Sequence, residues 1–271
     1  AQIVGIKVDR KGFIDLTELK EAVEKYKGEV ALISIMHSNN EVGTIEDIAQ
    51  IVKIAGDIPV HADCVQSFGK VELSFKDLGL TAATISAHKV GGPLGVAALI
   101  LKRGLDIEPI LHGGGQERDI RSGTFNAPSI VSFAAAAKES VAAIADRDKK
   151  VRALKSELIQ TVKKNVSDAW VNGDQTNCLP GITSITFPKT DSEGLLLLLD
   201  SEGIACSTGS ACSAGVQRPS HVLLAMGLTE DETTSTLRFS VSHSNTVTEI
   251  AKLGSVIASV VARSRAASGK K

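Results

Sequence analysis

Asp63 and Lys89 are a carboxylate and an amine that lie 26 residues apart, close to the length of one strand–helix–strand unit. A lysine that follows a strand and is partly removed from water can lose its proton and attack a carbonyl carbon, which forms a Schiff base. An aspartate at the neighbouring strand end could keep a pyridinium nitrogen protonated, as pyridoxal phosphate chemistry requires. Two ordinary polar residues would show the same spacing, so both interpretations stay open for this pair alone.

Cys212 lies within Ser207–Gly215 (STGSACSAG), a run of small residues. A thiol in such a segment should be exposed and able to move, which suits a nucleophile that travels between two places. Cysteines are more often buried and inert, so the segment alone does not decide its role. Cys64, Cys178 and Cys206 are interpreted as structural, although Cys206 is close enough in sequence to be a second thiol. The four cysteines form no C-x-x-C pair, so neither a metal site nor a disulfide framework is expected, and a reducing cytoplasm is favoured.

Ser86, His88 and Thr124 are donors near glycines and could bind a phosphate group. Neither G-x-x-x-x-G-K-[ST] nor G-x-G-x-x-G occurs, so a Walker site and a dinucleotide site are unsupported. A hydrolase is the rival hypothesis, because His112–Gly115 resembles an esterase oxyanion loop and 211–215 is one residue away from G-x-S-x-G. It is the weaker hypothesis, since a true nucleophile elbow directly follows a strand.

Strands that alternate with helices are needed to bring these residues together. The predicted strands are 30–36, 58–62, 83–86 and 95–101, with a helix after the first that has Thr44 and Asp47 in capping-box spacing. This alternation predicts a parallel sheet. Asn40, Asp63 and Lys89 follow strand ends, where ligands of parallel sheets bind.

The second half of the chain predicts a bridge into a smaller domain. A helix over 129–164, broken near 146–150, comes first. A helix over 192–202 is predicted to begin with a capping box of Thr190 and Glu193. The remaining predicted elements are strands at 182–187 and 237–241 and helices at 221–226 and 247–267. The sequence therefore predicts an α/β protein with a large domain over 1–145 and a small α+β domain over 146–271.

The composition of the 271 residues is that of a soluble globular protein, with 43% apolar and 23% charged residues. Thirty basic and thirty-one acidic residues give a formal net charge of −1, which provides no electrostatic footprint for nucleic acid or a membrane surface. The longest apolar runs, Leu195–Leu199 and Val96–Leu101, are far too short to span a bilayer.

Six ordered motifs together resemble the class V pyridoxal phosphate enzymes, specifically the cysteine desulfurases of the NifS/IscS type. The motifs are MHSNNEVG (36–43), HADCVQSFGK (61–70), SAHKVGGPLG (86–95), HGGGQERDIRSGT (112–124), STGSACSAG (207–215) and TLRFS (236–240). The resemblance implies the type I fold of pyridoxal phosphate enzymes, with a mostly parallel sheet. The family carries a further N-terminal stretch before the strand that leads to Asn40, so the large domain is expected to be incomplete here.

The resemblance implies a role for each matching residue around the cofactor. Lys89 would form the Schiff base, Asp63 would contact the pyridine nitrogen, and Asn40 and Gln66 would contact the ring. The residues implied at the phosphate are Ser86, His88 and, for the neighbouring subunit of a dimer, Thr124.

The resemblance also implies the reaction and its substrate. Cys212 would accept sulfur from L-cysteine as a persulfide, leaving L-alanine, and Arg238 would hold the substrate carboxylate, a task that suits its planar fork. The expected partners are a sulfur-acceptor or scaffold protein for iron–sulfur or thio-cofactor assembly and a second copy of the chain, in the cytoplasm. The alternatives are another class V enzyme, such as an aminotransferase or selenocysteine lyase, or an incomplete fragment that only dimerises or binds.

Overall fold

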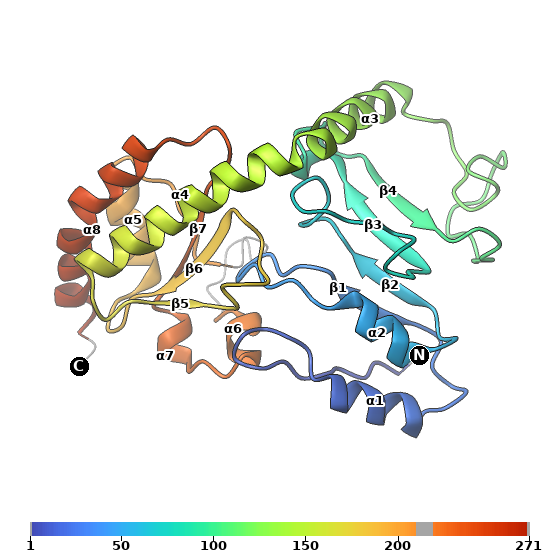
Figure 1. Ribbon diagram of the computed structural model, residues 1–271, viewed down its shortest axis with the longest axis horizontal. Helices are drawn as coiled ribbons and strands as arrows, with labels where there is room; N and C mark the ends of the chain where they lie inside the picture. The colour runs from blue at the N-terminus through green and yellow to red at the C-terminus, as the bar shows by residue number, and fades with distance from the viewer. Residues whose placement is uncertain (1, 210–218, 270–271) are drawn as a thin grey trace. The chain divides into compact units, whose positions relative to one another are not determined.

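The computed structural model describes residues 2–209 and 219–269 and divides into two compact units (Figure 1). The central unit comprises Tyr26–His37 and Asp47–Ile144. The C-terminal unit comprises Ala1–Lys25, Ser38–Glu46 and Ala145–Lys271. The proposed division into domains 1–145 and 146–271 stays a prediction, and two early segments are grouped with the later part of the chain.

The central unit is built on a four-stranded sheet in the order β1-β2-β3-β4. Strands β1, β2 and β3 are parallel, as predicted, whereas β4 is antiparallel to β3. Only ten residues separate β3 from β4, too few for the crossover that a parallel neighbour requires. The bounds are β1 Ile33–Met36, β2 Val60–Asp63, β3 Ala82–Ser86 and β4 Ala97–Leu101.

Two predicted capping boxes are wrong. Helix α2 (Ile48–Ala55) is capped by Asp47, whose side chain accepts from the Gln50 amide, and helix α5 (Ser192–Ser201) is capped by Asp191. Thr44 instead donates to the carbonyl oxygen of Lys11, and Thr190 donates to that of Phe187, three residues earlier. An aspartate closer to the helix competes successfully for the same role, because its carboxylate is also favoured by the helix dipole.

The long helical stretch is broken at Ala143, not near 146–150. Helix α3 (Ala127–Ala142) begins at the Asn126 cap, and helix α4 is Ile144–Asn165. Phe133 of α3 packs edge-on against Phe68, with ring centroids 6.4 Å apart. This contact joins α3 to the turn after β2.

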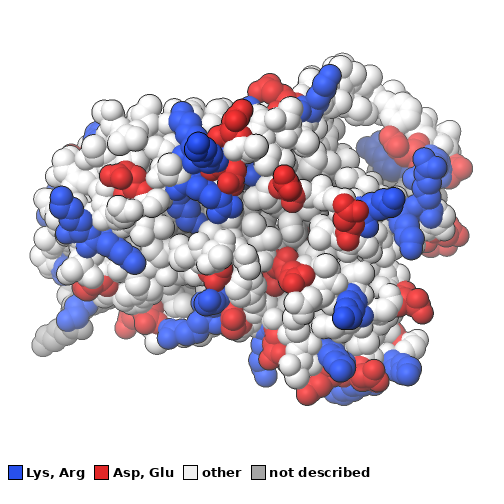
Figure 2. Space-filling view, in the orientation of Figure 1, with Lys and Arg blue, Asp and Glu red and all other residues white. Residues whose placement is uncertain are grey.

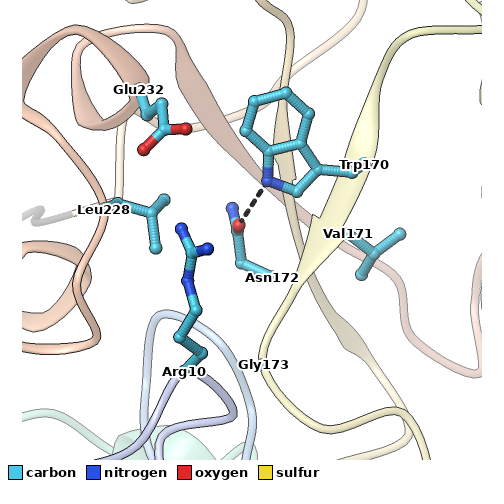
Figure 3. A pocket seen from close by; sticks show the side chains of 7 residues that line it. All are labelled: Arg10, Trp170, Val171, Asn172, Gly173, Leu228 and Glu232. Atoms are coloured by element: carbon cyan, nitrogen blue, oxygen red, sulfur yellow. Dashed lines mark hydrogen bonds between the residues drawn. The ribbon is translucent and has the colours of Figure 1, made fainter.

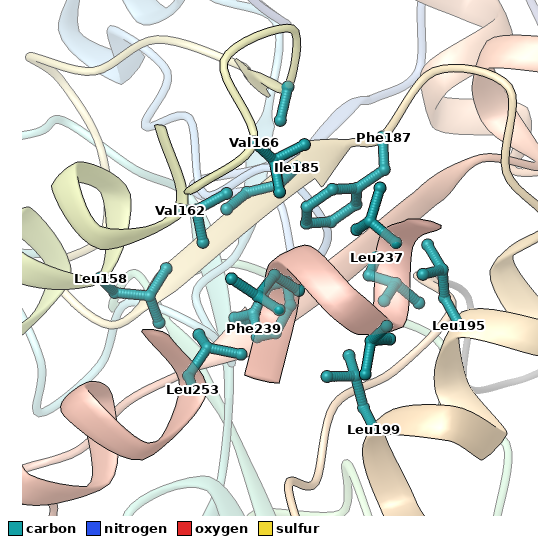
Figure 4. Close-up of a cluster of buried hydrophobic side chains, with 14 of the residues drawn as sticks. Leu158, Val162, Val166, Ile185, Phe187, Leu195, Leu199, Leu237, Phe239 and Leu253 are labelled. Atoms are coloured by element: carbon teal, nitrogen blue, oxygen red, sulfur yellow. The ribbon is translucent and has the colours of Figure 1, made fainter. Parts of the chain in front are cut away.

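The C-terminal unit has an antiparallel three-stranded sheet whose hydrophobic face is covered by α4, α5 and α8 (Figure 4). Phe187 and Phe239 meet edge to face in this core, surrounded by leucines such as Leu158, Leu199 and Leu253. Neither the first helix nor the strand at Trp170 was predicted. The remaining bounds are α1 Leu16–Lys25, β5 Trp170–Asn172, β6 Ile182–Thr186, α6 His221–Ala225, α7 Glu230–Thr233, β7 Thr236–Ser240 and α8 Val247–Ser268.

Positive and negative side chains are interspersed over the face shown in Figure 2. Within residues 2–209 and 219–269, no helix is both long enough and apolar enough to cross a membrane.

Candidate active site

The cofactor cluster, defined as Asp63, Gln66, Ser86, His88 and Lys89, lies in the central unit at the carboxyl ends of two paired strands. Asp63 is the last residue of β2 and Ser86 is the last residue of β3. Because the two strands are parallel and adjacent, their carboxyl ends lie at the same edge of the sheet. The sequence-based placement of these residues at strand ends is therefore correct.

Asp63 is held by the backbone around it. Its Oδ1 accepts a hydrogen bond from the backbone amide of Val65 at 2.9 Å. Its backbone carbonyl oxygen accepts one from the backbone amide of His37, also at 2.9 Å. No hydrogen bond from the described part of the chain reaches the second carboxylate oxygen, Oδ2. In the following turn, Gln66 Oε1 accepts from Lys70 Nζ at 3.1 Å. The aspartate is thus oriented while one oxygen stays available to a ligand.

Ser86, His88 and Lys89 lie on the short helix η1 (Ala87–Lys89) and the residue before it. Ser86 Oγ and His88 Nδ1 share a hydrogen bond of 2.8 Å. Lys89 is exposed, whereas the sequence argument assumed partial removal from water, so a bound ligand would have to cover it. The turn after η1 requires Gly92, since a Cβ there would lie 2.9 Å from the Cβ of Ala87.

Thr124 belongs to the segment between β4 and α3. It is exposed and follows Gly123, whose φ of 117° is a conformation that favours glycine. The amide of Gly123 donates to Gln116 Oε1 at 2.9 Å. These contacts shape the backbone before Thr124, and its assignment to a neighbouring subunit stays a prediction.

Arg238 and Asn40 meet within the C-terminal unit. Arg238 Nη1 donates to the carbonyl oxygen of Asn40 at 3.0 Å and to that of Gly209 at 3.4 Å. The backbones of Arg238 and Ser207 exchange two hydrogen bonds. The Ser207 amide donates to the Arg238 carbonyl oxygen at 3.0 Å, and the Arg238 amide donates to the Ser207 carbonyl oxygen at 2.6 Å. Arg238 Nε is buried and finds no hydrogen-bond partner in the described ranges. A buried cationic donor without an acceptor is costly, so this atom requires a partner that the described residues do not supply.

Cys212 lies outside the described residues. Burial raises the pKa of Cys64 to about 11, with Asp63 adding to the effect, and burial with Asp200 does the same for Cys206. These two cysteines are therefore thiols rather than thiolates at neutral pH, and Cys206 gains no support as a second nucleophile. Cys178 is buried.

Two buried polar residues beside these clusters, His37 and Glu41, were not singled out as site residues from the sequence. His37 is buried, burial lowers its pKa below 6.5, and its Nδ1 shares a 2.8 Å hydrogen bond with Ser67 Oγ. Glu41 is 3% exposed and accepts a hydrogen bond from Ser220 Oγ. The sequence feature that could have indicated them is their position inside the motif at 36–43.

A cavity of about 410 Å³ in the C-terminal unit contains none of the predicted site residues (Figure 3). The side chains of Arg10, Trp170 and Glu232 surround it, and Trp170 Nε1 donates to Asn172 Oδ1 at 3.1 Å. None of the predicted site residues that the structure describes lines this cavity.

A sequence profile of the family Aminotransferase class-V matches residues 1–253. The chain belongs to this family. The profile match confirms the predicted family, and the superposition on a solved NifS-like protein confirms the predicted fold class. Membership of this family implies pyridoxal phosphate as the cofactor. The assignment leaves the hydrolase hypothesis without support.

Known relatives narrow the activity further. The chain is 40% identical over 270 residues to an IscS-like cysteine desulfurase of Mycobacterium tuberculosis, covering 98% of this chain and 68% of that protein. A solved NifS-like protein from Rickettsia africae superposes with a TM-score of 0.87 at 36% identity, over 94% of this chain and 68% of that one. SspA, solved in complex with cysteine, gives a TM-score of 0.70 at 30% identity, over 89% and 66%. The chain thus spans about two-thirds of these relatives, which support cysteine desulfurase as its activity.

Proposed function

We propose that the protein is a pyridoxal phosphate-dependent enzyme that takes sulfur from L-cysteine, releases L-alanine and holds the sulfur as a persulfide on Cys212. The observation that carries this proposal is the buried Nε of Arg238, which has no hydrogen-bond partner among residues 2–209 and 219–269. The carboxylate of an amino-acid substrate would supply the missing acceptor, and arginine binds carboxylates with two parallel bonds. The cysteine bound to the related SspA favours cysteine as that amino acid.

The donor set of the cofactor cluster fits pyridoxal phosphate. Asp63 has a free carboxylate oxygen for the protonated ring nitrogen, and the hydroxyl and imidazole of Ser86 and His88 suit a phosphate group. The exposed amine of Lys89 is free to attach the cofactor covalently. The residues proposed for the ring are Asn40 and Gln66, and Thr124 is proposed for the phosphate of a neighbouring subunit.

The bound cofactor supplies an electron sink for the carbon skeleton of the substrate. Asp63 would keep a proton on the ring nitrogen and so maintain that sink. Arg238 would orient the substrate through its carboxylate. These two residues bind and orient, and neither breaks the carbon–sulfur bond.

Cys212 would perform the sulfur transfer as a thiolate. Its Sγ forms a bond to the substrate sulfur while the carbon–sulfur bond breaks, and the electron pair of that bond stays with the substrate carbon. That carbon then takes a proton, which completes L-alanine. The persulfide left on Cys212 has gained the sulfur atom without an external oxidant.

The decisive experiment compares the protein with its Cys212→Ser variant, both supplied with pyridoxal phosphate and cysteine. We expect a sulfur adduct on Cys212 in the intact mass of the parent, measured without reductant, and none in the variant. Alanine release should stop in Cys212→Ser, because no thiolate can take the sulfur. Undiminished alanine formation in the variant would contradict the proposal and favour an aminotransferase or lyase.

The proposed setting is a cytoplasmic homodimer that passes its sulfur to an acceptor or scaffold protein. The balanced surface charge in Figure 2 gives no reason to expect nucleic acid or a membrane surface as a partner. Size measurement in solution tests the dimer, and a mixture of Thr124→Val protein with unmodified protein tests whether Thr124 acts on a neighbouring subunit.

A further inference from the structure

Glu41 is a buried carboxylate in the turn that carries Asn40. Only 3% of the residue is exposed, and its Oε2 accepts a hydrogen bond of 2.6 Å from the hydroxyl of Ser220, which is 7% exposed. Its amide donates to Asn39 Oδ1 at 2.8 Å, which fixes the turn. A carboxylate is rarely buried unless it has a specific partner, because leaving water costs it hydration free energy.

Ser220 uses its side chain twice. The hydroxyl oxygen accepts a hydrogen bond of 3.2 Å from the amide of Leu223, and this bond caps α6. The same hydroxyl donates a hydrogen bond to Oε2 of Glu41. Ser220 lies two residues after the segment 210–218, which contains Cys212. Glu41 therefore holds the chain at the carboxyl side of that segment.

Glu41 also adjoins the amino side of the same segment. A Cβ placed on Gly209 would lie 3.1 Å from Glu41 Oε2, and Gly209 has a φ of 94°. The carbonyl oxygen of Gly209 accepts from Arg238 Nη1, which also donates to Asn40. The Asn40 turn thus meets the chain on both sides of 210–218, at Gly209 and at Ser220.

We propose that Glu41 is a positioning residue for the sulfur-transfer step. It sets Gly209 and Ser220, the residues from which the Cys212 segment starts and ends, relative to the turn that carries Asn40. The inference deepens the proposed function and rests on it. Since Glu41 touches neither cofactor nor substrate in this assignment, its loss should slow persulfide formation without weakening the binding of either.

The test is Glu41→Ala in the full chain supplied with pyridoxal phosphate. We expect the rate of persulfide formation on Cys212 to fall roughly tenfold to hundredfold, the range for losing a buried hydrogen bond to a charged group. The visible absorbance of the bound cofactor and the KM for cysteine should stay as in the parent. Glu41→Gln, which keeps an acceptor oxygen for Ser220, should recover most of the rate.

Ser220→Ala supplies the second arm of a double-mutant cycle. If both residues act through one hydrogen bond, the double variant should be no slower than the slower single variant. Glu249 and Thr246 are the matched control, a glutamate bonded to the cap of α8, and Glu249→Gln should leave the rate of persulfide formation unchanged.

The outcomes distinguish failure of the positioning role from failure of the proposed desulfurase function. If the parent forms the persulfide and Glu41→Ala forms it equally fast, the positioning role is wrong while the desulfurase function stands. The role is also wrong if Glu41→Ala loses the absorbance of the bound cofactor, or if its KM for cysteine rises by as large a factor as the rate falls. The substitution would then disturb cofactor or substrate binding rather than the sulfur-transfer step alone. If the parent forms no persulfide on Cys212, the proposed function fails and this inference fails with it. Should Glu41→Ala not fold, Ser220→Ala decides by the same criteria, because it removes the hydroxyl that bonds to Glu41.

Discussion

The cofactor cluster of the central unit and the arginine cluster of the C-terminal unit, defined as Asn40, Glu41, Gly209, Ser220 and Arg238, are organised in opposite ways. In the cofactor cluster, Lys89 and His88 are exposed. In the arginine cluster, Glu41 and Ser220 are buried, and the backbone and guanidinium of Arg238 are bonded to neighbouring chain segments.

The difference indicates two ways of preparing for a ligand. A group that forms a covalent bond to its cofactor needs access, and the bond itself then fixes its geometry. A group that recognises a carboxylate by hydrogen bonds gains most when it is already in place, because less freedom is lost on binding. The arginine cluster is therefore held by hydrogen bonds within the chain, whereas Lys89 and His88 of the cofactor cluster are exposed.

The largest expected effect follows from the covalent role of Lys89. Lys89→Ala should abolish covalent attachment of pyridoxal phosphate, measured by borohydride reduction and peptide mapping. Lys102→Ala, another exposed lysine of the central unit, is the control and should retain the adduct on Lys89. An adduct on a different lysine in the parent protein would refute the assignment of Lys89. The cofactor cluster would then no longer be an example of an exposed group that binds its cofactor covalently.

Arg238 and Asp63 should separate binding from chemistry. Arg238→Ala should raise the KM for cysteine by a factor that corresponds to about 2–5 kcal/mol, as for the loss of one partner of a buried charge pair. Asp63→Ala should instead lower kcat while the cofactor stays bound, because the ring nitrogen loses its counter-charge. Steady-state kinetics and cofactor absorbance distinguish the two. Parent-like alanine formation by both variants would show that the residue roles are wrong.

A smaller effect concerns the stability of the turn segment 38–46, which ends at Glu46. Burial raises the pKa of Glu46 from 4.5 to about 7, with Asp9 adding to the shift and the Ile14 amide opposing it. Between these two values the folded state binds more protons than the unfolded state, so stability falls as the pH rises from about 4.5 to 7. Glu46→Gln should remove this decline and be more stable than the parent at pH 8, measured by urea unfolding.

Glu249 provides a control of opposite sign. Hydrogen bonds from the Thr246 amide and hydroxyl lower the pKa of Glu249, so its contribution is present above the unfolded value and is lost as the pH falls. Glu249→Gln should therefore reduce stability at neutral pH and have little effect in acid. An unchanged pH dependence in Glu46→Gln would mean that ionisation of Glu46 does not destabilise the folded state.

Much of the fold could be predicted from local signals. The alternating apolar runs located β1, β2 and β3 to within a few residues, because buried strands must exclude polar side chains. The direction of β4 could have been inferred from its short connection, but the alternation of strands and helices favoured a parallel neighbour. The caps at Asp47 and Asp191 were missed because two candidate side chains stood within the same few residues.

The sequence by itself determined the family, the strand ends at Asp63 and Ser86, and the candidate residues, since each depends on residue types within a short stretch. Only the tertiary structure brought Arg238 to Asn40, 198 residues away, and Ser220 to Glu41, 179 residues away. No local pattern records such a pair, because the partners are chosen by how sheet, turn and helix pack once the core has formed. The same is true of the side chain of Arg238. The sequence shows that residue 238 is an arginine, but only the folded structure shows that its Nε is buried without a partner among the described residues.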